Sequence, residues 1–100
     1  MSLIEKIVEE ANRFYGLVYI TAIVDVETGK IKAYAVGVGG APIFENLEEN
    51  EELIWIHKHQ GERLTVEEVK EEIERQLEDI RNDEVRFYAP YPRYLYKKRR

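Results

Sequence analysis

Residues 17–38, LVYITAIVDVETGKIKAYAVGV, decide the fold that this chain can adopt. Leu17–Val26 is almost wholly apolar and rich in β-branched residues, which is typical of a central strand buried on both faces. ETGK at Glu27–Lys30 places a glycine where a hairpin needs a positive φ, and Ile31–Val38 supplies the returning strand. The stretch therefore predicts a hairpin whose first strand lies inside a sheet.

Two helices are predicted, one before and one after the strands. Ser2 and Glu5 have the spacing of a capping box, and the apolar stripe that follows predicts a helix over Ser2–Tyr15. Thr65 and Glu68 repeat that spacing at the start of a second helix. The apolar stripe of this second helix consists of Val66, Val69, Ile73, Leu77 and Ile80.

Further strands are predicted on both sides of the second helix. Leu53–His59 (LIWIHKH) alternates with period two, so its odd-numbered residues face one side of the sheet and its even-numbered residues the other. Val85–Ala89 is interpreted as a fourth strand and Tyr94–Tyr96 as a short edge strand. The order αβββαβ predicts a single α+β domain with a mixed four- or five-stranded sheet and two helices packed on one face. We assign residues 1–92 to this domain and 93–100 to a basic, aromatic C-terminal edge or tail.

The segment between the second and third strands contains two contrasting runs. GVGGAP at Gly37–Pro42 is interpreted as a flexible bend, because a phosphate-binding loop needs a Lys-Ser/Thr pair and a helix after its glycines. ENLEENEE at Glu45–Glu52 carries five carboxylates and no cation. We expect this second run to be a solvated loop.

Composition narrows the classes of function. The 100 residues include no cysteine, which excludes disulfides, thiolate nucleophiles and cysteine-ligated zinc. No apolar run approaches the roughly 18 residues of a transmembrane helix, and the start MSLIEKIVEE lacks the pattern of a secretory signal. We therefore expect a cytoplasmic protein without a membrane span. Charged residues make up 35%, a content typical of thermophilic proteins.

The charges are distributed unevenly along the chain. Met1–Val85 holds nine basic and twenty acidic residues, a net charge of −11, whereas Arg86–Arg100 holds six basic residues and no acidic ones. A nucleic-acid or partner site is therefore expected in this C-terminal segment. Its candidate residues are Arg86, Tyr88, Arg93, Tyr94, Tyr96, Lys97, Lys98, Arg99 and Arg100. The alternative is that the aromatic residues pack as an edge strand and the last four cations prevent edge-to-edge pairing.

His57 and His59 form a candidate metal site. At positions i and i+2 of a strand, both imidazoles project from the same face and could share a zinc ion. Such a site needs a third ligand, which a nearby carboxylate such as Glu68 could supply. The alternative is that the histidines are two polar residues at the end of a strand, so the expected cofactor is none, with zinc as the alternative.

The segment LIWIHKHQGERLTVEE at Leu53–Glu68 resembles the metal-binding stretch of the JAB/MPN metallopeptidases. In that family a strand ends in His-x-His and a Ser/Thr-x-x-Asp begins the next helix. The resemblance implies that His57 and His59 are zinc ligands, that Thr65 is the hydroxyl residue, and that Glu68 occupies the position of the third ligand.

The chain also departs from that family. Gln60 stands where a proline usually follows the second histidine, and Glu68 replaces an aspartate. Residues 12–15, Asn-Arg-Phe-Tyr, stand where the catalytic glutamate is expected. The resemblance therefore implies either a metal-dependent hydrolase or a relative without catalytic activity, since no general base would activate the water.

These observations favour a binding protein over an enzyme. We expect a small intracellular accessory or interaction protein that binds nucleic acid weakly through its basic, aromatic C-terminus. The alternatives are the JAB/MPN-like hydrolase and a structural subunit of a larger complex. Pairing of two copies through the sheet face opposite the helices, with Tyr19, Tyr34 or Trp55 at the interface, is a further expectation.

Overall fold

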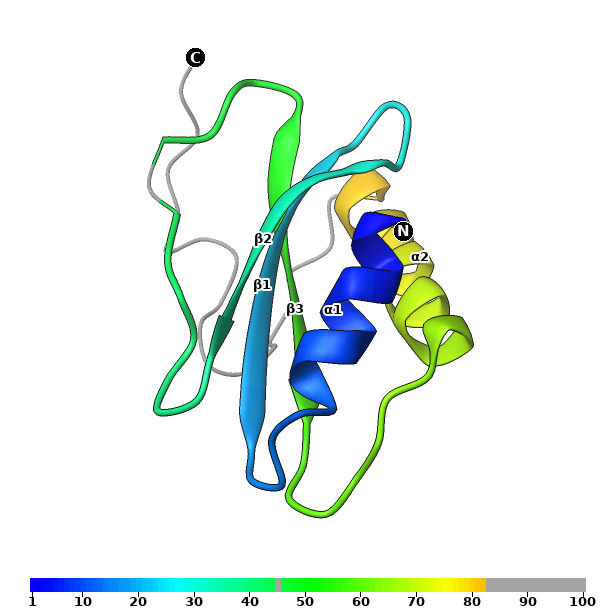
Figure 1. Ribbon diagram of the computed structural model, residues 1–100. Helices are drawn as coiled ribbons and strands as arrows, with labels where there is room; N and C mark the ends of the chain where they lie inside the picture. Colours follow the sequence, from blue (N-terminus) through cyan, green and yellow to red (C-terminus); the bar gives the residue numbers. More distant parts are fainter. Residues whose placement is uncertain (45, 83–100) are drawn as a thin grey trace.

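The computed structural model describes residues 1–44 and 46–82, which form two helices and a three-stranded sheet (Figure 1). In chain order the elements are α1 (Leu3–Ala11), β1 (Val18–Asp25), β2 (Ile31–Gly37), β3 (Glu51–Lys58) and α2 (Val66–Arg81). The described strands have the order β2-β1-β3, and both pairings are antiparallel. An α+β domain with two helices is thus confirmed, with β1 as the central strand of the described sheet.

Other parts of the predicted fold lie outside the described residues. The fourth strand at Val85–Ala89, the edge strand at Tyr94–Tyr96 and the mixed four- or five-stranded sheet that they would complete stay predictions. The same holds for the division of the chain at residue 93. Within the two described ranges, no helix is both long enough and apolar enough to cross a membrane.

Both helices begin with the predicted capping box. Ser2 Oγ accepts a hydrogen bond from the Glu5 backbone N–H at 3.1 Å, and Glu5 Oε1 accepts one from the Ser2 N–H at 2.8 Å. The hydrogen bonds with the Ser2 backbone and then its hydroxyl lower the pKa of Glu5 below its ordinary value. Thr65 and Glu68 make the same reciprocal pair at the start of α2, at 3.1 and 3.2 Å.

The first helix is shorter than predicted, because α1 ends at Ala11 and not at Tyr15. The side chain of its C-cap residue, Asn12, accepts a hydrogen bond from the Leu64 N–H at 2.8 Å and donates one to the Leu64 carbonyl at 3.0 Å. Tyr15 is largely exposed, at 74%, and its carbonyl accepts a hydrogen bond from the Gly61 N–H. The chain after Asn12 therefore bonds to the segment before α2 and does not continue the helix.

Both helices lie on one side of the sheet and share one hydrophobic core with it (Figure 1). Its buried residues are Ile7, Ala11, Val18, Ile20, Val24, Ile54, Ile56, Val69, Ile73, Leu77 and Ile80. Two polar contacts fix the helices to the sheet. Tyr34 Oη of β2 donates to Glu10 Oε1 of α1 at 2.8 Å, and burial together with this bond raises the pKa of Tyr34.

The second contact joins α2 to β3 through Gln76, which is fully buried. Gln76 Nε2 donates to the Trp55 carbonyl at 2.7 Å, and Gln76 Oε1 accepts from the Trp55 N–H at 3.3 Å. The side-chain amide thus satisfies backbone groups of β3, in the way that a neighbouring strand would.

The loop after β2 crosses the opposite face of the sheet. Thr21, fully buried in β1, donates its hydroxyl to the Pro42 carbonyl at 2.7 Å, and Leu47, Leu53 and Trp55 form a second small core. The turn into this loop is tight at Gly37, where an added Cβ would overlap the Gly40 carbonyl oxygen.

The prediction that the acidic run Glu45–Glu52 is a solvated loop is wrong for its last two residues. Glu51 and Glu52 belong to β3 and are only 7% and 4% exposed. Glu51 pairs with Asp25 of β1 and Glu52 pairs with Val24, so both glutamates are buried by their place in the sheet. Lys32 Nζ lies 2.5 Å from Glu51 Oε2 and supplies the opposite charge.

The Lys32–Glu51 pair predicts a stability that depends on pH. Lys32, followed by the Glu48 backbone N–H, holds the pKa of Glu51 below its ordinary value of 4.5. A lowered carboxyl pKa adds stability above the unfolded-state pKa and loses it as the pH falls through the folded-state value. Glu51→Gln is therefore expected to be less stable than the wild type at pH 7, with a gap that closes below about pH 4.5 in urea titrations. Glu49→Gln, at an exposed residue nearby, is the control. If the difference in stability between Glu51→Gln and the wild type did not change with pH, the stabilising role of the Lys32–Glu51 pair would be contradicted.

Candidate functional site

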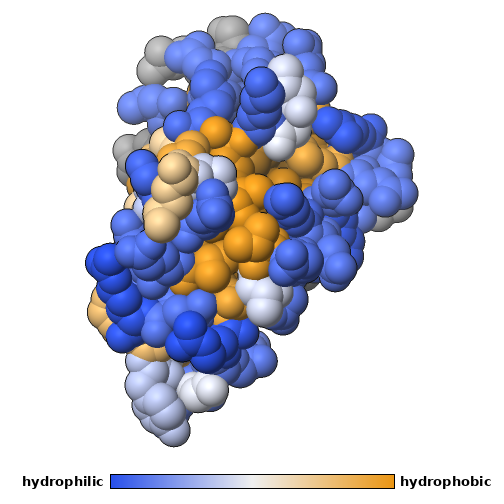
Figure 2. Space-filling model, turned by 45° about the vertical axis from the view of Figure 1, so that its right-hand side comes forward, coloured by the Kyte–Doolittle hydropathy of each residue, from blue (hydrophilic) through white to orange (hydrophobic). Residues whose placement is uncertain are grey.

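A groove opens between the two helices at the end of the molecule that holds the β1–β2 turn. The helices are joined at the opposite end, where Asn12 bonds to Leu64. Towards the start of α1 and the end of α2 they leave a groove of ≈ 650 Å³. Figure 2 shows hydrophobic residues gathered in the centre of this face, with hydrophilic residues on both sides. We call this feature the α1–α2 groove; its volume lies within the range of ligand sites, roughly 300–1,000 Å³.

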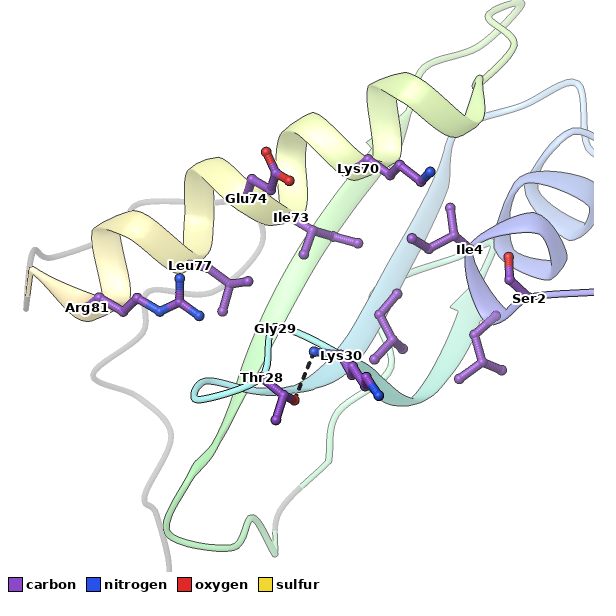
Figure 3. A pocket seen from close by; sticks show the side chains of 12 residues that line it. Ser2, Ile4, Thr28, Gly29, Lys30, Lys70, Ile73, Glu74, Leu77 and Arg81 are labelled. Carbon is purple, nitrogen blue, oxygen red and sulfur yellow. Dashed lines mark hydrogen bonds between the residues drawn. The ribbon is translucent and has the colours of Figure 1, made fainter.

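The floor of the α1–α2 groove is apolar. Ile73 and Leu77, one turn apart on α2, point into it, and Ile4 points into it from α1 (Figure 3). Ile31, at the start of β2, also lines it. Ile4 and Ile31 are half-buried, so the edge of the main core reaches the surface here.

The end of the groove is built on a rigid turn. Asp25 Oδ1 accepts hydrogen bonds from the Glu27 and Thr28 N–H groups at 2.9 and 3.1 Å, and Gly29 takes a φ of 76°. An added Cβ at Gly29 would make ordinary van der Waals contact with a methyl group of Leu77, at 3.5 Å, so it is the positive φ that favours glycine here.

Arg81 fastens the same turn to α2. Its Nε and Nη2 atoms donate to the Val26 carbonyl at 3.1 and 2.6 Å. Arg81 is nevertheless exposed, and its guanidinium lies at the mouth of the groove. Arg81 therefore both holds the β1–β2 turn against α2 and places a cationic side chain at the groove.

The rim of the groove is positive although the chain is acidic. Among the described residues, Lys30, Lys70 and Arg81 line it together with one carboxylate, that of Glu74, which points away from Ile4 in Figure 3. The whole chain carries a net charge of −5. Three cations around an apolar floor favour a ligand that is both apolar and anionic.

The predicted metal ligands are arranged differently from a zinc site. His57 is half-buried in β3 and its ring packs edge-on against Tyr19 at 5.0 Å between centroids, whereas His59 is exposed beyond the strand. The two imidazoles lie 6.2 Å apart and nearly perpendicular. Glu68 Oε1 accepts hydrogen bonds from the Thr65 N–H and hydroxyl.

These three residues therefore have separate structural environments. Over residues 1–44 and 46–82, no three histidine, aspartate or glutamate side chains are grouped so that they could hold a metal ion. Glu68 works in the capping box of α2, as the spacing from Thr65 predicts, and the JAB/MPN-like alternative finds no third ligand within that part of the chain.

The expected dimer surface on the sheet needs correction. Trp55 is only 2% exposed, beneath the loop that carries Pro42, and Tyr34 faces the helices and bonds to Glu10. These two aromatic residues therefore do not form a surface with Tyr19. The expected binding residues between Arg86 and Arg100 all lie outside the described residues, so that site stays a prediction.

Sequence reasoning missed the α1–α2 groove. Its floor uses residues that any core-facing stripe would contain, and its cations are scattered at positions 30, 70 and 81. One signal was present in the sequence: three of the nine cations before residue 86 flank this apolar set. The chain matches no protein-family model, no curated protein and no solved structure, so its own geometry alone bears on its function.

Proposed function

We propose that this chain is a small accessory protein that binds a partner in the α1–α2 groove. The observation that carries the proposal is the apolar floor of Ile4, Ile31, Ile73 and Leu77 inside a cationic rim. Ile4 and Ile31 supply the half-buried part of this floor, whereas Ile73 and Leu77 are only 4% exposed at its base. A concave apolar surface with convergent polar groups is the usual form of a binding site. The surrounding helices are fixed by capping boxes and by Asn12, so the site is largely preformed.

The proposal predicts crosslinks from the groove and not from the neighbouring helix surface. A photo-crosslinking residue at Lys70, which lines the groove, is compared with one at the adjacent exposed Glu71, which does not. In extracts of the cells that produce this protein, only the Lys70 position is expected to give a specific adduct. The captured protein is then purified, and Lys70→Glu is expected to weaken its binding at least tenfold.

Lys6→Glu is the matched control for that experiment. It makes the same change of charge at an exposed position of α1 outside the groove, and it is expected to leave the affinity within about twofold. Equal crosslinking from Lys70 and Glu71, or equal loss of affinity in Lys70→Glu and Lys6→Glu, would contradict the proposal.

We further propose that the C-terminal segment gives the protein weak affinity for nucleic acid. The support is its charge, since Arg86–Arg100 carries six cations and no carboxylate beside an acidic body. Lys97–Arg100 supplies four consecutive cations, which predict a slope of about −3 for log K against log salt with single strands.

This second proposal predicts loss of binding on truncation. Deleting residues 93–100 is expected to abolish the fluorescence anisotropy change of a labelled single-stranded RNA or DNA at low salt. Lys30→Gln combined with Lys70→Gln, which removes cations from the groove only, should leave the anisotropy change intact. Undetectable binding by the full chain, or equal binding after truncation, would rule the proposal out.

A further inference from the structure

The cations of the α1–α2 groove stand at both of its ends. Lys70 and Arg81 lie eleven residues apart on α2, which corresponds to about 16 Å along a helix. The apolar side chains of Ile73 and Leu77 lie between them, and Lys30 approaches from the turn side (Figure 3). A complementary ligand therefore has an apolar middle and a negative charge towards each end.

This pattern distinguishes between classes of ligand. A fatty acid or similar acyl carboxylate has one charged end and would leave the second cationic end without a partner. A polypeptide helix of about three turns matches the 16 Å length and can carry carboxylates near both ends. The spacing of Ile73 and Leu77, one turn apart, also fits the apolar anchors of a helix that lies in a groove.

We propose that the α1–α2 groove binds an amphipathic α-helix of a partner protein, with acidic residues flanking its apolar stripe at both ends. This inference rests on the proposed function and names the partner's chemistry. The apolar stripe lies against Ile4 and Ile31 and against the small exposed parts of Ile73 and Leu77. The flanking carboxylates pair with Lys70 at one end and with Lys30 and Arg81 at the other.

Other occupants fit the groove less well. A twofold-symmetric pair of copies would bring the cationic rim against itself, because such an interface uses the same surface on both subunits. The segment Arg93–Arg100 carries five cations and no carboxylate, so the rim repels it. The exposed residues of α2 are all charged, so this helix offers the groove of a second copy no apolar anchors.

The test uses designed helical peptides of about 15 residues, a length at which a helix can form in water. The first peptide has leucines at i, i+4 and i+7 and glutamates at both ends. The second replaces each glutamate by lysine. The third has the composition of the first, but its leucines are rearranged so that they form no stripe. Laurate serves as the acyl ligand. Affinity is measured by fluorescence anisotropy or, for laurate, by calorimetry, and the site by amide chemical shifts of residues 2–4, 28–31 and 70–81.

The acidic amphipathic peptide is expected to bind at least tenfold more tightly than the other two peptides, with shifts confined to the groove. In the double variant Lys30→Glu, Lys70→Glu the order is expected to reverse, so that the lysine peptide binds more tightly. A folding defect would weaken both peptides and would not reverse their order. The control Lys6→Glu, Arg63→Glu makes the same change of charge at two exposed positions outside the groove and should keep the original order.

Several outcomes would overturn the inference. Tighter binding of laurate or of the lysine peptide in the groove would reject the acidic helix while leaving the groove as a docking site. Dimerisation in sedimentation equilibrium that is lost in the double variant would identify a second copy as the occupant. Failure of every peptide and of laurate to shift the groove amides rejects the inference, and the crosslinking comparison then decides separately whether the groove binds any partner.

Discussion

The Gln76→Glu variant is expected to be less stable than the wild type by about 3–5 kcal/mol at pH 7, the range for an uncompensated buried charge. Gln76 is fully buried, and its Nε2 atom donates to the Trp55 carbonyl at 2.7 Å. Glutamate has the same shape, but it would place a carboxylate oxygen against that carbonyl oxygen. Glu72 Oε1, 3.3 Å from Nε2, would add a like charge.

The pH dependence separates this effect from a change of packing. Burial and the nearby oxygens raise the folded-state pKa of the introduced carboxyl, so the variant regains stability as the pH falls and the carboxyl becomes protonated. Urea titrations at about pH 7 and pH 4 measure the gap. Gln60→Glu, at the only other glutamine of the sequence, which is exposed, is the control. A gap below about 1 kcal/mol at pH 7 would show that Gln76 does not hold β3.

Gly37→Ala is expected to cost about 2–4 kcal/mol, because the added methyl group would overlap backbone atoms. Its Cβ would meet the Gly40 carbonyl oxygen and would lie 3.0 Å from Pro42 Cδ. The loop cannot move aside cheaply, since the Pro42 carbonyl accepts the buried hydroxyl of Thr21 and the loop covers Trp55. For a domain of this size the melting temperature would fall by on the order of 10–30 °C.

Gly39→Ala provides the matched control two residues away. No atom lies within 4 Å of a Cβ added there, and its φ lies outside the left-handed region. This control is expected to change the unfolding free energy by less than about 1 kcal/mol. Similar losses in both variants would mean that backbone flexibility, rather than the close approach at Gly37, explains the glycine-rich turn.

The secondary structure could largely be predicted, because local signals and burial agree. The two capping boxes locate the starts of both helices, and the apolar run of Leu17–Val26 identifies the central strand. The end of α1 could not be predicted, since it depends on a hydrogen-bonded partner, Leu64, far along the chain. The burial of Glu51 likewise depends on Lys32, which a different strand brings to it.

The candidate site was less accessible to sequence reasoning. A stripe such as Ile73 and Leu77 looks the same whether a neighbouring helix covers it or leaves a groove beside it. The angle between α1 and α2 decides which occurs, and contacts across the whole domain set that angle. Conversely, the period-two pattern correctly predicts β3 as far as Lys58, but His59 lies beyond the strand and the pattern contains no information on a third ligand.

The bond between Asn12 and Leu64 also bears on the order in which the chain can fold. These residues are 52 positions apart. Forming their contact therefore costs the conformational entropy of a long loop, which contacts between near neighbours in the sequence do not cost. During synthesis, α1 leaves the ribosome before the other described elements, yet Leu64 follows only after all three described strands have been made. Of the described elements, the one made earliest is therefore among the last to be fixed in place, and the groove beside it can form only once translation has passed through α2.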